Sequence, residues 1–348
     1  MKRMYFCATM VGLIAVTLLI SGWASPGSGQ EQKVEKVVLA YSVPVPGSDS
    51  TFLFAGKQLG FFKEQGIDLQ IQTTQGAVAA AGFVASGTVD VAFGTVEAVP
   101  GYVLQGVPVK VIYLYAYRPI FSLGLFKGGR IQKVGDVKGK KIGVSTLGSA
   151  AIPVLQYILK EAGLALSDVT LVPVGVGPAA VVAMKSGAVD AVMFWDTAYV
   201  NYMGQGIELS LVSSPKLQQA YAGLAIYAQE RIITGRRKAL EGFLRGLTKS
   251  LAYSTKSPAG ATRAFGELHP EIAKNPKLEQ AMWEERLKIQ VLPPAARGQW
   301  GYMDSVHFEN LLEVLHLGGL IKEKPPVEKL YTTEFLKAAN EVDLSRLP

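Results

Sequence analysis

The 348-residue chain carries 35 Lys and Arg against 28 Asp and Glu, a formal net charge of +7. Its length predicts two domains. The basic residues are spread along the chain rather than gathered in one run, so we expect no nucleic-acid partner. A single cysteine, Cys7, excludes a disulfide framework, a thiolate metal site and a cysteine nucleophile in the rest of the chain.

The first residues have the pattern of a secretory signal peptide. Lys2 and Arg3 precede an apolar run over residues 6–20, and small residues follow it. That run has about 15 residues, fewer than the roughly 20 that a membrane-spanning helix needs. We therefore predict a signal peptide over residues 1–29, cut between about residues 24 and 30, and a periplasmic or extracytoplasmic location. The alternative is an uncleaved N-terminal anchor.

Strand-like and helix-like segments alternate over the first two thirds of the chain. This rhythm is typical of an α/β fold with mostly parallel sheets. The expected strands are residues 36–41, 67–73, 89–93, 109–115, 141–144, 169–174 and 191–194. The expected helices between them are residues 52–65, 76–86, 95–105, 150–162, 178–186 and 196–205. After residue 228 the pattern is only helical, with expected helices at 234–255, 259–268, 276–287, 300–317 and 326–331.

Two parts of the chain repeat each other at an offset of 100 residues. Ser86-Gly87 with Val89-Asp90 recurs as Ser186-Gly187 with Val189-Asp190, and Tyr102 with Gln105-Gly106 recurs as Tyr202 with Gln205-Gly206. Each glycine can take the left-handed turn that ends a helix. One α/β unit therefore occurs twice, which predicts two similar lobes.

These observations predict two lobes, each a mostly parallel sheet with flanking helices, and an all-helical C-terminal tail. Lobe 1 is expected to span residues 34–116 and, with the tail, 227–348. Lobe 2 is expected to span residues 117–226. The chain then crosses between the lobes near residues 115–118 and 225–229, where we predict a hinge.

Candidate ligand-binding residues follow the predicted strands, because open α/β sheets bind ligands at the carboxyl ends of their strands. Most are hydroxyl-bearing residues, glycines that let a ligand approach the backbone, or aromatics. Tyr117 is added because it lies at the first predicted crossing. The candidates are Ser42, Pro44, Ser48, Thr51, Gly94, Thr95, Tyr117, Ser145, Thr146, Gly148, Ser149, Gly175, Trp195 and Asp196.

Two of these loops indicate opposite ligand chemistry. Residues 145–149 precede a predicted helix, whose free N–H groups and positive dipole end favour an anion. Trp195 can stack on a planar ligand, and Asp196 can accept hydrogen bonds from it. The structural alternatives are simple helix capping by the serines and Asp196, with Trp195 in the core. The charge of the ligand stays open.

Catalysis and metal binding have no sequence support. His269, His307 and His316 all lie in the predicted helical tail, away from the strand-end loops. No metal-binding His–Glu spacing, nucleophile elbow or phosphate-binding loop occurs. We therefore expect no catalytic residue, no metal and no cofactor.

Several segments resemble a known family. They are residues 54–63 (FAGKQLGFFK) with 66–69 (GIDL), 86–94 (SGTVDVAFG), 139–144 (GKKIGV) and 186–191 (SGAVDA). With them the chain resembles the periplasmic binding proteins of the nitrate/sulfonate/taurine and thiamine-pyrimidine-precursor ABC importers. The resemblance covers about residues 37–211 well and the tail only loosely. The family's ligand loops fall on residues 42–51, 94–95, 145–149 and 195–196, and Asp196 keeps the acid of the family's Trp-Glu-Pro motif while its proline is lost.

The resemblance implies a periplasmic binding protein type II-like fold and a role in transport. The protein would be the extracytoplasmic solute-binding component of an ABC importer and not an enzyme. It would capture a small organic or anionic ligand (sulfonate, nitrate, carboxylate or pyrimidine-like) between two lobes. As a monomer, it would deliver this ligand to a permease and its ATPase. The alternatives are a pyrimidine-precursor synthase-like enzyme, whose cysteine-rich motif is missing here, and a ligand-sensing binding protein that feeds a receptor.

Overall fold

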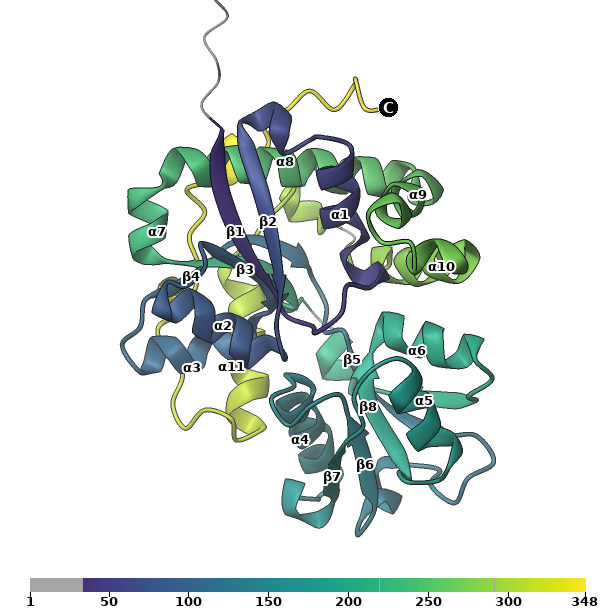
Figure 1. The fold of residues 1–348 in the computed structure, drawn as a ribbon. Coiled ribbons are helices and arrows are strands. Elements are labelled where there is room, and N and C mark those ends of the chain that lie inside the picture. The colour runs from purple at the N-terminus through teal and green to yellow at the C-terminus, as the bar shows by residue number, and fades with distance from the viewer. Residues whose placement is uncertain (1–33, 219, 291) are drawn as a thin grey trace, which may run out of the picture. The chain divides into compact units, whose positions relative to one another are not determined.

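Two five-stranded sheets form the framework of the computed structural model, which describes residues 34–348 apart from 219 and 291 (Figure 1). The predicted signal peptide lies outside the described residues. The first sheet has the order β2-β1-β3-β10-β4 and the second the order β7-β6-β8-β5-β9. The strands of the first sheet are β1 (Glu35–Tyr41), β2 (Ile67–Thr73), β3 (Val91–Thr95), β4 (Val109–Ala116) and β10 (Leu224–Gln229). Those of the second sheet are β5 (Phe121–Phe126), β6 (Lys141–Val144), β7 (Thr170–Pro173), β8 (Ala191–Trp195) and β9 (Leu209–Val212).

The predicted α/β fold with two lobes and mostly parallel sheets is confirmed, and in each sheet one strand runs against the other four. In the first sheet β1 pairs in parallel with β2 and β3, whereas β10 is antiparallel to β3 and β4. In the second sheet β6 pairs in parallel with β7 and β8, whereas β5 is antiparallel to β8 and β9. Strands β5 and β10 are the first strands after the two crossings. Each runs antiparallel to both of its neighbours in the sheet that it joins. The sequence did not predict β5, β9 or β10.

The return to the first lobe comes earlier than predicted. The expected boundary between residues 226 and 227 falls inside β10, which pairs along its whole length with strands of the first sheet. The second sheet ends with β9 at Val212. The second crossing is therefore the segment between Val212 and Leu224.

Helices cover both faces of each sheet. Figure 1 shows α2 and α3 on one side of the first sheet and α1 and α8 on the other. The helices up to the second crossing are α1 (Thr51–Gln58), α2 (Ala77–Ser86), α3 (Val99–Leu104), α4 (Ala151–Glu161), α5 (Pro178–Lys185) and α6 (Asp196–Gly204). The tail adds α7 (Glu230–Gly235), α8 (Arg237–Lys256), α9 (Pro258–Leu268), α10 (Pro276–Leu287), α11 (Ser305–Leu317) and α12 (Leu336–Ala339). In the described part of the chain, none of the helices is both long and apolar enough to cross a membrane.

Several predicted helices are shorter than expected; for example, α11 begins at Ser305 and not at residue 300, and the predicted helix 326–331 is a short 3-10 turn over Val327–Lys329. Helix α1 ends at Gln58 and not at residue 65, because Gly60 takes a left-handed φ of 79° that turns the chain. The predicted helix 234–255 is divided into α7 and α8. Thr234 lies inside α7, where its hydroxyl donates to the carbonyl of Glu230.

The repeated Ser-Gly-x-Val-Asp motif has the same structural role in both lobes. Gly87 and Gly187 end their helices with left-handed φ values of 74° and 71°. The Asp90 carboxylate accepts the N–H of Val38 at 2.8 Å. The Asp190 carboxylate accepts the N–H of Lys141 at 2.8 Å. Each motif therefore ends a helix and joins the next strand to its neighbour.

The second sheet buries alternate residues of β8 on opposite faces, as a strand must. Ala191 and Met193 belong to the hydrophobic core that includes α4. Val192 and Phe194 belong to a separate core with residues of α5 and α6. The core that contains α4 also includes most of the first lobe. Apolar packing therefore continues from the first lobe into the second.

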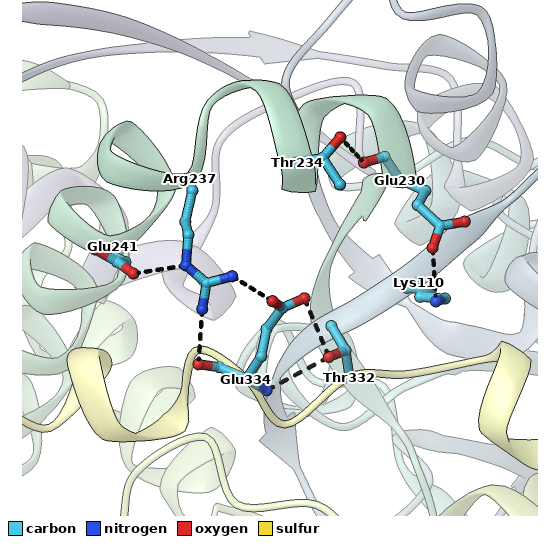
Figure 2. Close-up of polar contacts among 7 residues, drawn as sticks. All are labelled: Lys110, Glu230, Thr234, Arg237, Glu241, Thr332 and Glu334. Atoms are coloured by element: carbon cyan, nitrogen blue, oxygen red, sulfur yellow. Dashed lines mark hydrogen bonds and ion pairs between the residues drawn. The ribbon is translucent and has the colours of Figure 1, made fainter.

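The helical tail packs on both lobes, whereas the sequence predicted packing on one. Arg237 of α8 binds Glu334 near the C-terminus and donates to Glu241 at 3.1 Å, and Lys110 of β4 pairs with Glu230 (Figure 2). The Arg237 contacts join parts of the tail to each other, and the Lys110–Glu230 pair joins the tail to the first lobe. Helix α10 also packs against α6, and α11 against α4, in the second lobe.

The two crossings are hydrogen-bonded to each other and to the tail. The N–H of Tyr221 donates to the carbonyl of Tyr117 at 3.1 Å. The N–H of Tyr117 donates to Ile289 at 3.1 Å, and that of Ala222 donates to His307 at 3.0 Å. Any hinge motion must therefore take place beside tail residues.

Candidate functional site

A cavity of about 50 Å³ lies between the strand ends of the two sheets. A buried water needs about 10–15 Å³ by this measure, so the cavity admits roughly three to five waters. A ligand larger than about five heavy atoms therefore needs the lobes to part. The first lobe supplies Tyr41, Ser42, Val43, Pro44, Asp49, Gly76, Ala77, Phe93, Thr95, Leu224 and, from α10, Arg286. The second lobe and the first crossing supply Ile120, Phe121, Ser145, Thr146, Ser149, Ala150 and Trp195.

Half of the candidate residues line this cavity together. They come from four strand-end loops, two in each lobe, as expected if the carboxyl edges of the sheets face one site. Hydroxyl groups dominate the set, and Trp195 adds one aromatic wall. The seven residues are Ser42, Pro44, Thr95, Ser145, Thr146, Ser149 and Trp195.

Three other candidates support the first loop or approach the site closely. The hydroxyl of Thr51 donates to the carbonyl of Ser48 at 2.7 Å, and the hydroxyl of Ser48 binds Glu279 of α10. These contacts fix the loop that carries Asp49. A Cβ at Gly94 would lie 2.8 Å from the Cβ of Ser42, so only glycine fits there.

Three further candidates, Tyr117, Gly148 and Gly175, do not line the central cavity, and Asp196 lies beside it. Tyr117 is buried at the first crossing, where its backbone N–H donates to the carbonyl of Ile289 in the tail. Its ring packs edge-on against His307, with the ring centroids 5.5 Å apart. Gly148 lines a neighbouring cavity. Gly175 takes a left-handed φ of 73° before α5 and does not line the central cavity.

A buried ion pair between the lobes stands beside the cavity. Nη2 of Arg286, in the last turn of α10, lies 2.6 Å from Oδ1 of Asp196, which begins α6. The side chain of Arg286 is 1% exposed and that of Asp196 12%. Burial raises the pKa of Asp196, and the charge of Arg286 opposes that shift. Burial lowers the pKa of Arg286, but Asp196 and Asp49 outweigh it, so the net shift is upward and the guanidinium stays charged.

Some buried polar atoms at this site have no hydrogen-bonding partner. They include Nε of Arg286, Oδ2 of Asp196 and the hydroxyl oxygen of Thr146. Buried polar atoms normally have a partner, since an unpartnered one costs about 1–3 kcal/mol. The free donor and the free acceptor belong to one ion pair. Arg286 lines the cavity, whereas Asp196 stands behind it, so a ligand donor reaches Asp196 only when the cavity widens.

The charges in and beside the cavity sum to a negative value. Asp49, whose Oδ2 accepts the Tyr41 hydroxyl at 2.6 Å, lines the cavity together with Arg286. With Asp196, two carboxylates stand against one guanidinium. A bare anion would meet this excess negative charge. No group of three or more His, Cys, Asp or Glu residues in the described ranges is arranged to hold a metal ion.

Arg286 is the main residue of the candidate site that the sequence did not predict. It lies in a tail helix, where no strand-end loop drew attention to it. One signal was available: Met282, Trp283 and Arg286 share the buried face of α10 at helical spacing. An arginine on such a face is rarely fully buried unless it is paired.

Comparison with known proteins identifies a family and relatives with the same fold. The model of the family described as NMT1/THI5 like matches residues 48–261. A putative thiamine biosynthesis protein of Haemophilus influenzae is 24% identical over 278 residues, which cover 78% of this chain and 84% of that protein. The alkanesulfonate-binding protein SsuA of Xanthomonas axonopodis pv. citri, solved bound to MOPS, has a TM-score of 0.64 at 15% identity, with 87% of this chain and 97% of that chain covered.

The fold also occurs in an enzyme. The desulfurization enzyme DSZB has a TM-score of 0.56 at 15% identity, with 87% of this chain and 98% of that chain covered. Likeness at such low identity shows the fold alone. The chain therefore has the periplasmic-binding-protein fold, and the choice between binding and catalysis depends on its own site.

Proposed function

The chain belongs to the NMT1/THI5-like family, and on that premise we propose that it is the extracytoplasmic solute-binding protein of an ABC importer. One observation supports this proposal most: strand-end loops of both lobes line a single cavity, beside which a buried ion pair joins the lobes. Among the described residues that line the cavity there is neither a histidine nor a cysteine. This composition favours binding over an enzyme of the pyrimidine-precursor synthase type.

The charges favour a neutral or amphoteric organic ligand. Nε of Arg286 offers one hydrogen bond to an acceptor, and Oδ2 of Asp196 accepts one from a donor. Nitrate and simple sulfonates or carboxylates carry no donor for Asp196. A pyrimidine-like or amide-like edge carries both groups, and the Trp195 ring can stack on its plane.

The ligand acts by contacting both lobes. Ser42 and Thr95 belong to the first lobe, and Ser145, Thr146 and Trp195 to the second. A ligand that binds both sets favours the closed form over the open one, by its difference in affinity for the two. The monomer in its closed form is then the species that the permease and ATPase of the importer recognise.

Thermal-shift screening of the purified protein tests this function. The panel contains alkanesulfonates, nitrate, aromatic carboxylates and pyrimidines. A compound at 100 times its Kd should stabilise the protein by about 2.7 kcal/mol. We expect the largest shift from neutral or amphoteric compounds. If no compound raises the melting temperature while one is chemically converted, the binding function is wrong.

Removing one contact from the second lobe should weaken binding without unfolding the protein. Trp195→Ala should reduce affinity for the best panel compound about tenfold or more, through the lost stacking surface. Ser145→Ala should reduce it about fivefold, through one lost hydrogen bond. Calorimetric titration measures both. Ser210→Ala, on the exposed side of β9, is the control. Unchanged affinity in both site variants would place the ligand elsewhere.

A further inference from the structure

We propose that the ligand site has a second compartment, which receives an apolar arm of the ligand ending in an ammonium or similar N–H donor at Glu97. This inference rests on the proposed function and adds the chemistry of a second part of the ligand. The compartment is a cavity of about 140 Å³ that shares Ser149 and Ala150 with the central cavity. The two cavities therefore adjoin at these residues, at the start of α4.

The walls of the compartment are mostly apolar and come from four parts of the chain. Helix α2 contributes Val78, the segment before α3 contributes Ala98, and the second lobe contributes Leu147, Ile152 and Pro153. Leu320 of the tail completes it. Val78, Leu147 and Leu320 are 52%, 63% and 49% exposed. Apolar side chains with this much exposure, gathered at one cavity, are what an apolar ligand group would cover.

Glu97 gives the compartment its polar end. The residue is 2% exposed, and its Oε1 accepts the hydroxyl of Tyr221 at 3.1 Å. Its Oε2 is buried, and the hydroxyl of Thr95, which is otherwise unpartnered, is the neighbouring side-chain donor. A buried carboxyl group without a full set of partners is costly, and a donor from the ligand would supply the missing one. Glu97 is also the only ionisable side chain among the residues that the structure describes as lining this compartment.

The compartment selects the charge of the ligand's end group. Burial raises the pKa of Glu97 to about 7, while its own backbone and the neighbouring Thr95 and Tyr221 act in the opposite direction. An ammonium group favours the ionised carboxylate and forms a charge-assisted hydrogen bond. A carboxylate or sulfonate end would be repelled, since the lining holds no basic side chain to pair with it.

Calorimetric titration with hexylamine and with 1-hexanol tests the compartment directly. The two probes share an apolar chain and differ in charge, and a pH of about 8 ionises Glu97 while the amine stays protonated. We expect hexylamine to bind at least about tenfold more tightly than 1-hexanol. Glu97→Gln keeps an acceptor for Tyr221 and should reduce hexylamine to the affinity of 1-hexanol. Glu208→Gln, an exposed acid away from the cavity, is the charge-matched control and should change nothing.

A second variant keeps the test decisive if Glu97→Gln does not fold. Leu147→Ala changes an exposed wall residue and should weaken both probes by about threefold or more. Equal affinities for the two probes, undetectable binding of either, or an unchanged hexylamine affinity in Glu97→Gln would overturn the inference. The best panel compound for the central cavity, titrated into the same variants, reports separately on the proposed function.

Discussion

Replacing Arg286 by methionine is expected to lower the free energy of unfolding by about 3–5 kcal/mol, because breaking a buried ion pair leaves one charge buried alone. The charge left behind is Asp196, whose side chain is 12% exposed. Methionine fills much of the space of the arginine, so the loss reports on charge more than on packing. Urea unfolding measures the change. Arg263→Met, at an exposed position of α9, should cost less than about 0.5 kcal/mol.

The double variant separates charge from packing. Arg286→Met combined with Asp196→Leu removes both charges, and apolar replacement of a whole buried pair is often neutral. We therefore expect the double variant to be more stable than Arg286→Met alone. With the Asp196→Leu single variant added, the cycle gives the coupling energy of the pair. A single variant that loses less than about 1 kcal/mol would contradict the buried, interlobe pair described above.

Glu97 is expected to make stability fall as the pH rises through the range from about 4.5 to 7. The ordinary glutamate pKa of 4.5 is raised to about 7 in the folded state, mainly by burial. Between these values the folded state holds more protons than the unfolded chain, so stability decreases with pH and levels off above about 7. The full effect of this one group is about 3 kcal/mol. Tyr221 and Tyr227 are the titratable side chains that face it.

The matched variant isolates this effect from the other titrating groups. Glu97→Gln keeps an acceptor for the Tyr221 hydroxyl but cannot ionise. Urea unfolding at several pH values should show the stability of the variant gaining on that of the wild type by about 3 kcal/mol between pH 4.5 and 8. Parallel curves for the two proteins would show that the carboxyl group is not buried as described.

The sequence predicted the repeated architecture because its signals were local. Gly87 and Gly187 end helices, and the aspartates three residues later bond the neighbouring strands. The strand-end loops followed from the same pattern, since the order of strand and helix fixes which loops reach the carboxyl edge of a sheet. Seven residues chosen on that basis line one cavity.

The features that the sequence did not predict depend on distant contacts. Strand β10 is an apolar run whose partners, β3 and β4, lie more than 100 residues earlier, and its antiparallel direction follows from the crossing. Arg286 becomes a site residue only because α10 packs against α6. Tyr117 was predicted to face the cleft, and the backbone bond to Ile289 at the crossing places it elsewhere. Local patterns carry no information about such packing.

The distance between the lobes, measured with and without ligand, tests the central claim most directly. Spin labels can be attached at Phe83→Cys in α2 and Val182→Cys in α5, both exposed, in a chain whose single native cysteine, Cys7, is replaced by serine. Without ligand we predict a longer-distance population, because a cavity of about 50 Å³ holds no more than about five waters, so most organic ligands need the lobes to part. Saturation with the panel compound that gives the largest melting shift should remove that population. A distance distribution that does not change at saturation would contradict binding by closure of the two lobes.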